Sequence, residues 1–183
     1  MAHTFVLVHG AWHGGWCWRR VADRLRRDGH VVFTPTLTGL GERAHLLAPG
    51  IDLATHVADV VNLLKWERLS DVVLCGHSYG GFVIPASLKS CRHRPARLCS
   101  WTLFLPENGD TIQKLTGVAV QDAIRAAMQR GDLGVRPRPA EAFGVNAADR
   151  DWVDSLCVPQ PIGTFTSPIA LSGARERIAR KTY

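Results

Sequence analysis

The sequence has no long apolar run, no paired-cysteine motif and little lysine. Residues 5–8 are too few for the apolar core of a secretory signal, and no stretch approaches the ~18 apolar residues of a membrane-spanning helix. The five cysteines are odd in number and never spaced C-x-x-C: Cys17, Cys75, Cys91, Cys99 and Cys157. These absences predict a cytoplasmic protein with free thiols and no membrane partner.

A metal site is not expected either. Cys91, His93 and Cys99 lie close together in the sequence, but a fourth ligand at a recognised spacing is missing. Gly39–Ala44 matches G-x-G-x-x-A, yet it follows a proline-bearing loop instead of directly ending a strand, so it is a poor dinucleotide-binding motif. The sequence therefore predicts neither a metal nor a cofactor.

Arginine supplies most of the net charge of +6. Such a balance can indicate a nucleic-acid partner. The densest basic run, residues 89–97, has no alternating aromatic side chains on which bases could stack. The arginines of residues 19–27 alternate with apolar residues at helical spacing, which is typical of a solvated helix face. We therefore expect no nucleic-acid partner.

The length of 183 residues and the hydrophobic content of 46% predict one globular domain. Apolar, β-branched runs predict buried strands at residues 4–9, 30–34 and 71–75. Helical spacing of apolar residues predicts helices at 16–27 and 52–68. Strands that alternate with helices predict the α/β class, with a mainly parallel sheet covered on both faces.

The second half of the chain is less regular. We expect a strand at residues 98–105 and a helical segment at 110–130. A proline-rich lid at 134–168 and the start of a further element at 178–183 should follow. The predicted single domain, residues 1–183, thus has a core of residues 1–106 and 172–183. Its cap covers roughly residues 107–171.

Gly76-His77-Ser78-Tyr79-Gly80 fits the pattern G-x-S-x-G directly after a predicted strand. In a nucleophile elbow the serine lies on a strained strand-to-helix turn, and the two glycines leave room where a Cβ atom would clash. The positive end of the following helix would point at the reacting centre. The simpler alternative is a glycine-rich turn without chemistry, but the order of strand, motif and helix favours Ser78 as a nucleophile.

His9-Gly10-Ala11 follows the first predicted strand. An acyl-transfer intermediate carries negative charge on oxygen and needs two N–H donors. The residue after the nucleophile, Tyr79, supplies one, and Ala11 most simply supplies the other. We interpret His9 itself as a buried histidine with satisfied hydrogen bonds and no catalytic role.

Three segments carry a family resemblance: FVLVHGAWHGGWCW (5–18), PTLTGLGERAHL (35–46) and VLCGHSYGGFVI (73–84). They resemble the branch of α/β-hydrolases that holds plant methyl-ester esterases, the salicylic-acid-binding esterase, hydroxynitrile lyases and bacterial relatives. The resemblance returns at residues 103–110 and 160–183. It implies an α/β-hydrolase fold with a small cap, no cofactor, and cleavage of small carboxylic esters by a Ser–His–Asp mechanism.

The same resemblance implies an acyl-enzyme on Ser78, with Ala11 and Tyr79 as the backbone donors of the oxyanion hole. Hydroxynitrile lyases of this branch tend to carry threonine where this chain has Gly10, whose hydrogen cannot help to hold a cyanohydrin oxygen. Gly10 therefore favours an esterase over the alternative of a hydroxynitrile lyase.

The catalytic partners of Ser78 are not found in the sequence. The family order is serine, acid, then histidine, but no histidine follows His93. Acidic residues without such a histidine cannot be assigned: Asp110, Asp122, Asp149, Asp151 and Asp154. We expect a chain truncated at its C-terminus, without the last strands and helix of the fold, and the exposed sheet edge predicts self-association.

Without a base, a serine hydroxyl is a weak nucleophile. A substitute base from His9, His13 or His45 would need unusual geometry. A non-catalytic binder of small esters, or an inactive fragment, is therefore the alternative to an active esterase.

Residues 85–103 also depart from the family pattern. Pro85 falls inside an expected helix, which it should kink or stop. Cys99–Thr102 replaces an apolar strand that carries an aspartate in the family. Our hypothesis is a compensated pair of frameshifts between about codons 85 and 103.

Overall fold

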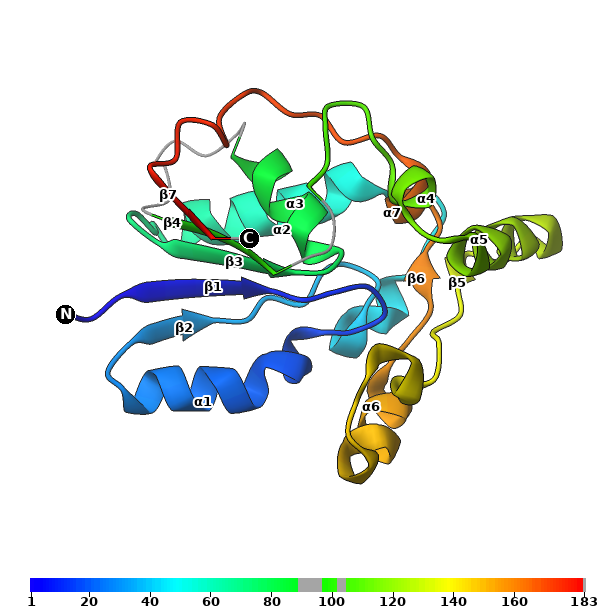
Figure 1. Cartoon of the computed structure of the whole chain (residues 1–183), viewed down its shortest axis with the longest axis horizontal. Helices are drawn as coiled ribbons and strands as arrows, with labels where there is room; N and C mark the ends of the chain where they lie inside the picture. Colours follow the sequence, from blue (N-terminus) through cyan, green and yellow to red (C-terminus); the bar gives the residue numbers. More distant parts are fainter. Residues whose placement is uncertain (89–96, 102–104, 183) are drawn as a thin grey trace.

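The computed structural model describes residues 1–88, 97–101 and 105–182 (Figure 1). Its main sheet has five parallel strands in the order β2-β1-β3-β4-β7. Their bounds are β1 Thr4–Val8, β2 Val31–Phe33, β3 Val73–His77, β4 Arg97–Trp101 and β7 Arg180–Thr182. The predicted parallel α/β sheet is confirmed.

Helices cover both faces of the sheet (Figure 1). The 3-10 helix η1 (Gly15–Trp18) and helix α1 (Arg19–Arg27) cover one face, and helices α2 (Leu53–Trp66) and α3 (Gly80–Ser87) cover the other. Successive side chains of a strand point to opposite faces. Accordingly Val6 and Val8 pack in the larger core with α2 and α3, whereas Leu7 packs with α1.

Helix α2 begins at a capping box. The Asp52 carboxylate accepts a hydrogen bond from the amide of Thr55 over 2.9 Å, and the Thr55 hydroxyl interacts with the amide of Asp52. Such a box satisfies two N–H groups that the first turn leaves unpaired. It fixes the start of the helix that carries His56 and Asp59 towards the β2–α2 loop.

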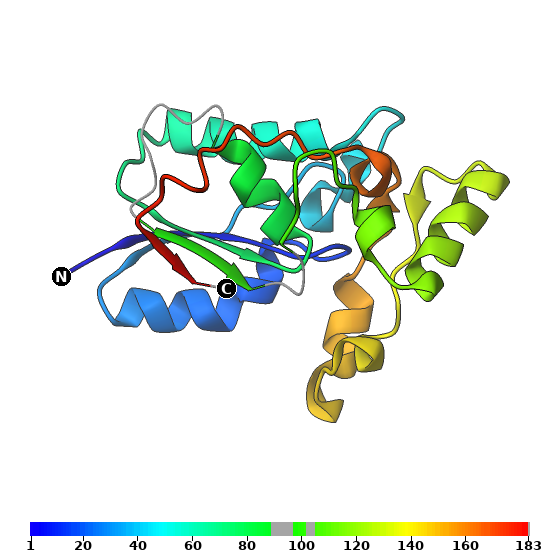
Figure 2. The same cartoon turned by 45° about the horizontal axis from the view of Figure 1, so that its top comes forward.

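The elements from α4 to α7 (residues 112–166), here called the cap, lie beyond the carboxyl ends of β1 and β3 (Figures 1 and 2). It is made of short elements: α4 (Ile112–Leu115), α5 (Val118–Arg130), β5 (Gly134–Val135), η3 (Ala140–Phe143), η4 (Ala147–Asp149), α6 (Arg150–Leu156), β6 (Gln160–Pro161) and α7 (Gly163–Thr166). Strands β5 and β6 pair antiparallel in a separate small sheet.

The structure refines three predicted segments. The helical region expected at 110–130 is two helices, because Thr116 has extended backbone angles between α4 and α5. The glycine-rich loop after β2 contains a short 3-10 helix, η2 (Gly41–Leu46). The element expected to begin at residue 178 is β7, which pairs with β4.

Pro85 lies inside α3, which ends two residues later at Ser87. A proline cannot donate the amide hydrogen bond of an inner helical position, so an early end is the expected outcome. Of the strand predicted at 98–105, residues 98–101 are observed in β4 (Arg97–Trp101), and residues 102–104 lie outside the described residues. Residues 89–96 and 102–104 of the frameshift hypothesis lie outside the described residues, and the hypothesis stays a prediction.

No helix in the described ranges is long and apolar enough to cross a membrane. The same residues contain no group of three or more His, Cys, Asp or Glu side chains placed to hold a metal ion.

Candidate active site

Ser78 occupies the turn between β3 and α3. Its backbone φ is +50°, in the left-handed region that residues other than glycine rarely adopt. The turn is closed by the amide of Gly81, which donates to the Ser78 carbonyl over 2.8 Å. The side chain is partly exposed. A serine in this strained conformation at the start of a helix has the geometry of a nucleophile elbow.

Steric crowding requires glycine at positions 76 and 80 of the motif. A Cβ atom on Gly76 would lie 2.5 Å from the carbonyl oxygen of Gly80. A Cβ atom on Gly80 would lie 2.6 Å from the carbonyl oxygen of Val8, which belongs to β1. Both contacts are with backbone, which cannot move aside cheaply. The steric reason expected for the motif is therefore present in the fold.

The loop after β1 packs directly against the serine. A Cβ atom on Gly10 would lie 3.3 Å from the Cβ of Ser78 and 3.2 Å from Nδ1 of His77. In the described part of the chain, no protein acceptor is found for the amide N–H of Ala11 or of Tyr79. The fold thus brings Ser78 beside the Ala11 loop, with both candidate oxyanion donors available.

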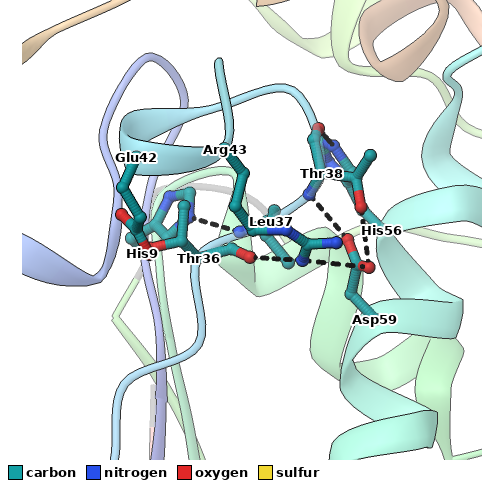
Figure 3. Close-up of polar contacts among 8 residues, drawn as sticks. All are labelled: His9, Thr36, Leu37, Thr38, Glu42, Arg43, His56 and Asp59. Atoms are coloured by element: carbon teal, nitrogen blue, oxygen red, sulfur yellow. Dashed lines mark hydrogen bonds and ion pairs between the residues drawn. The ribbon is translucent and has the colours of Figure 1, made fainter. Parts of the chain in front are cut away.

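His9 is completely buried and uses both ring nitrogens. The amide of Leu37 donates to its Nε2 over 3.1 Å (Figure 3). The other nitrogen, Nδ1, therefore carries the proton and donates to the carbonyl of Gly10 over 2.8 Å. Burial lowers the pKa of His9 to about 3. This geometry agrees with the interpretation of His9 as a structural histidine and leaves it no free nitrogen to act as a base.

His13 also forms a hydrogen bond within the loop after β1. Its Nδ1 donates to the carbonyl of Ala11 over 2.6 Å, and its ring stacks on Trp16. Burial lowers the pKa of His13. His13 and His77 line a cavity of about 350 Å³ together with Cys17, Trp18 and Val21.

None of the other histidines in the described residues completes a triad with Ser78. His45 lies exposed in η2. No described histidine makes a hydrogen bond to the hydroxyl of Ser78. The substitute base considered from the sequence is therefore not assembled among the described residues.

The later acidic residues make ion pairs and hydrogen bonds within the cap or with α1. The Asp110 carboxylate pairs with Lys114 over 2.7 Å and accepts the amide of Glu107. Asp149 pairs with Arg20 of α1 over 2.6 Å. The remaining contacts join Asp122 to Arg125, and Asp154 to the amide of Ala140.

A buried polar network supports the side chain of Tyr79. The Tyr79 hydroxyl donates to Nδ1 of His56 over 2.9 Å, because Nε2 of His56 carries the proton that it donates to the carbonyl of Thr38 over 2.8 Å. The Thr38 amide and hydroxyl both donate to Asp59, which also pairs with Arg43 (Figure 3). Sequence reasoning missed this network, because its hydrogen bonds join residues 16 to 23 positions apart that form no local motif.

Thr36 makes further hydrogen bonds in the β2–α2 loop. Its hydroxyl donates to Glu42 over 2.9 Å and accepts the amide of Gly15, and its carbonyl accepts a hydrogen bond from Arg43 (Figure 3). The β2–α2 loop is thereby held by its own polar side chains against the start of η1.

The model of the alpha/beta hydrolase family matches residues 5–181. The chain belongs to the α/β-hydrolase family. It is 42% identical to the carbendazim hydrolyzing esterase of Nocardioides sp. (strain SG-4G), over 98% of this chain and 78% of that protein. It is 34% identical to methylesterase 4 of Arabidopsis thaliana, over 70% of this chain and 48% of that protein.

Solved α/β-hydrolases share the fold. An extracellular α/β-hydrolase from a Paenibacillus species superposes with a TM-score of 0.87 at 23% identity, covering 99% of this chain and 76% of that one. A methylesterase of Arabidopsis superposes with a TM-score of 0.74 at 20% identity, covering 97% and 75%. The predicted fold and the resemblance to carboxylic-ester hydrolases are confirmed for this α/β-hydrolase.

Proposed function

We propose that this α/β-hydrolase cleaves small carboxylic esters through an acyl-enzyme on Ser78. The observation that carries the proposal is the backbone of Ser78, which has a φ of +50° between two glycines that have no room for a Cβ atom. This arrangement presents a serine hydroxyl above the carboxyl edge of a parallel sheet.

In the proposed reaction, Ser78 Oγ forms a bond to the ester carbonyl carbon and the carbonyl oxygen becomes an oxyanion. The amides of Ala11 and Tyr79 donate hydrogen bonds to that oxyanion. Collapse of the intermediate breaks the bond to the alcohol, which leaves as its alkoxide and takes up the proton that the Ser78 hydroxyl released to water. Water then hydrolyses the acyl-enzyme. This chemistry uses neither a metal nor a cofactor.

The proton of Ser78 needs an acceptor. Loss of the triad histidine costs about 10⁶-fold in kcat in a serine hydrolase, although the oxyanion hole and binding retain about 10³–10⁴-fold over water. The described histidines make no hydrogen bond to Ser78. Acylation of Ser78 by an activated ester is therefore a more sensitive test than turnover.

The substrates to be tested follow from the relatives. Carbendazim is indicated by the name of the Nocardioides relative, and methyl esters are indicated by the names of the plant methylesterases. We propose this substrate class for the present chain, with the acyl and alcohol groups to be decided by assay.

The direct test is acylation by p-nitrophenyl acetate. We expect a burst of p-nitrophenol and an acetylated peptide that contains Ser78, and loss of both in Ser78→Ala. Ser155→Ala is the matched control, because Ser155 is an exposed serine on α6 in the cap. Equal burst and labelling in wild type and Ser78→Ala would refute the proposal.

A second candidate is a non-catalytic binder of small esters or acids. It is favoured by the lack of a hydrogen bond between Ser78 and any described histidine. Binding of an ester by calorimetry without acetylation of Ser78 would support the binder and overturn the esterase.

We also propose a division into a core of residues 1–106 and 172–183 and a cap of roughly 107–171. The run of short elements from α4 to α7, followed by the return of the chain to the sheet in β7, supports these boundaries. Limited proteolysis should cut near 107 or 171 before it cuts within the core.

The exposed strand β7 at the edge of the sheet supports self-association of this chain. An elution volume that shifts with concentration in size-exclusion chromatography is expected, and a constant monomer would contradict it. A cytoplasmic location is proposed on the free thiols of the described cysteines, Cys17, Cys75, Cys99 and Cys157. Cell fractionation tests it.

A further inference from the structure

Trp12, which directly follows the candidate oxyanion donor Ala11, has an unusual backbone. Its φ is +67°, which costs a tryptophan about 1–2 kcal/mol relative to ordinary backbone. The amide of Trp12 donates to Oε1 of Gln160 over 2.9 Å, and its carbonyl accepts the amide of Val158 over 3.0 Å. Its indole Nε1 donates to the carbonyl of Val135 over 2.9 Å. Hydrogen bonds to the cap therefore satisfy the amide, the carbonyl and the indole N–H of Trp12.

The ring of Trp12 is held by the cap as well. It contacts the rings of Phe143 and Phe165, both with centroids 5.6 Å away. Trp12 is 8% exposed, so these contacts and hydrogen bonds form in a place that excludes water. The strained conformation next to Ala11 is thus maintained by contacts from a segment more than 120 residues away in the sequence.

Gln160 is itself held in one orientation by α7. Its side chain is completely buried, and its Nε2 donates to the hydroxyl of Thr164 over 2.7 Å. The Thr164 hydroxyl donates in turn to the carbonyl of Pro161 over 2.7 Å. A chain of buried hydrogen bonds therefore orients the Gln160 amide, whose oxygen accepts from the amide of Trp12.

We propose that Gln160 is a positioning residue that holds the amide of Ala11, a candidate oxyanion donor, in place through Trp12. The inference rests on the proposed function, since it concerns the same site. Gln160 does not touch the substrate. Its oxygen accepts from the peptide N–H that follows Ala11, and its nitrogen is anchored by Thr164.

The side-chain amide of Gln160 supplies two hydrogen-bonding groups that an apolar residue could not supply. A primary amide offers an acceptor and a donor at one position, and here each is used by a different loop. Methionine has a similar volume but offers neither group, so Trp12 could relax from its positive φ. Loss of one oxyanion donor typically costs about 10²–10³-fold in rate.

The test compares Gln160→Met and Gln160→Glu with wild type. Single-turnover kinetics with p-nitrophenyl acetate separates the acylation rate from the apparent binding constant. We expect Gln160→Met to lower the acylation rate about 100-fold, with the binding constant changed less than about threefold. Gln160→Glu keeps an acceptor for Trp12 and should lose less. Hydrogen exchange should show a protected Trp12 amide in wild type and rapid exchange in Gln160→Met.

A second probe does not depend on a general base. Trifluoroacetophenone forms a hemiketal with a serine hydroxyl, and ¹⁹F NMR reports the affinity of this adduct, whose oxygen sits in the oxyanion hole. We expect Gln160→Met to weaken the adduct by a factor similar to that in acylation. Gln121→Met is the matched control, because Gln121 is a half-buried cap glutamine that bonds only to the carbonyl of Thr116 in the structure.

The outcomes separate the two proposals. If wild type and Ser78→Ala behave alike with both probes, the proposed function fails and this inference fails with it. If wild type reacts at Ser78 and a folded Gln160→Met keeps its acylation rate and adduct affinity, only the inference is overturned. Should Gln160→Met fail to fold, Thr164→Val removes the acceptor that orients the Gln160 amide and must lower the acylation rate at least tenfold.

Discussion

The amide of Leu37 donates a hydrogen bond to Nε2 of His9 across 3.1 Å, where His9 has no exposed surface. This bond sets the neutral tautomer of the imidazole, since Nδ1 must then carry the proton that it donates to Gly10. A second proton on the ring would face the Leu37 amide and would break the bond. Protonation of His9 is therefore coupled to the loop that packs against Ser78.

The first prediction concerns stability in acid. The pKa of His9 is about 3 in the folded protein, against 6.5 for the unfolded chain. Below pH 6.5 the unfolded chain binds a proton that His9 in the folded protein does not bind, so the free energy of unfolding decreases as the pH is lowered. The slope approaches about 1.4 kcal/mol per pH unit below pH 6.5, and the loss between pH 6.5 and pH 4.5 is about 2 kcal/mol. Urea unfolding over this range measures it.

Two variants isolate the contribution of His9. His9→Gln should be less stable at pH 7, but its stability should fall less steeply between pH 6.5 and pH 4.5. His45→Gln, at an exposed position, should keep the slope of the wild type. Equal slopes for His9→Gln and wild type would contradict the assignment. Burial also lowers the pKa of His56, so His56 also decreases the free energy of unfolding in acid, and it does so in all three proteins.

The second prediction concerns the space around the elbow. Gly80→Ala would place a Cβ atom 2.6 Å from the carbonyl oxygen of Val8 and 2.9 Å from that of His9. Both are backbone atoms, so α3 or β1 must shift, and we expect a loss of about 2–3 kcal/mol in the free energy of unfolding. Thermal and urea denaturation measure this loss.

Gly117→Ala is the control for Gly80→Ala. Gly117 precedes α5, and no atom lies within 4 Å of a Cβ added there. We expect its stability to change by no more than about 0.5 kcal/mol. Equal stabilities of the two variants would show that the close approach of α3 to β1 does not constrain residue 80.

The strands and the elbow were predictable because their signals are local. Residues 4–9 and 71–75 are short apolar runs, and Gly76–Gly80 carries its turn geometry in five consecutive residues. The glycines were correctly explained by steric requirement. The predicted roles of Ser78, Ala11 and Tyr79 agree with this geometry and stay predictions until they are tested.

The supporting contacts had no comparable signal. Gln160 and Trp12 are 148 residues apart, so no periodicity or spacing indicates that they meet. The break between α4 and α5 was missed because Thr116 and Gly117 interrupt a run whose apolar spacing is otherwise helical. Such features depend on tertiary packing, which overrides local propensity.

The third prediction concerns the strain at Ser78. Glycine adopts a positive φ without the steric cost that a Cβ atom causes. Ser78→Gly should therefore be about 1 kcal/mol more stable than Ser78→Ala, although neither variant can be acylated. Arg68 has a φ of +51° at an exposed site after α2, so Arg68→Gly and Arg68→Ala form a matched pair. A Ser78→Gly variant less stable than Ser78→Ala would mean that residue 78 is unstrained.

The last prediction concerns Gly10, the residue on which the expectation of an esterase over a hydroxynitrile lyase was based. A Cβ atom there would lie 3.3 Å from the Cβ of Ser78 and 3.2 Å from Nδ1 of His77, so these side chains must move by a few tenths of an ångström. His77 is exposed and can adjust, which predicts a modest effect on stability. Displacement of a nucleophile by about 1 Å can cost about 10²-fold, so this smaller shift in Gly10→Ala should slow acylation of Ser78 by about tenfold. Stopped-flow acylation by p-nitrophenyl acetate measures the rate, and an unchanged rate would show that Ser78 reacts from a position that the β1 loop does not restrict.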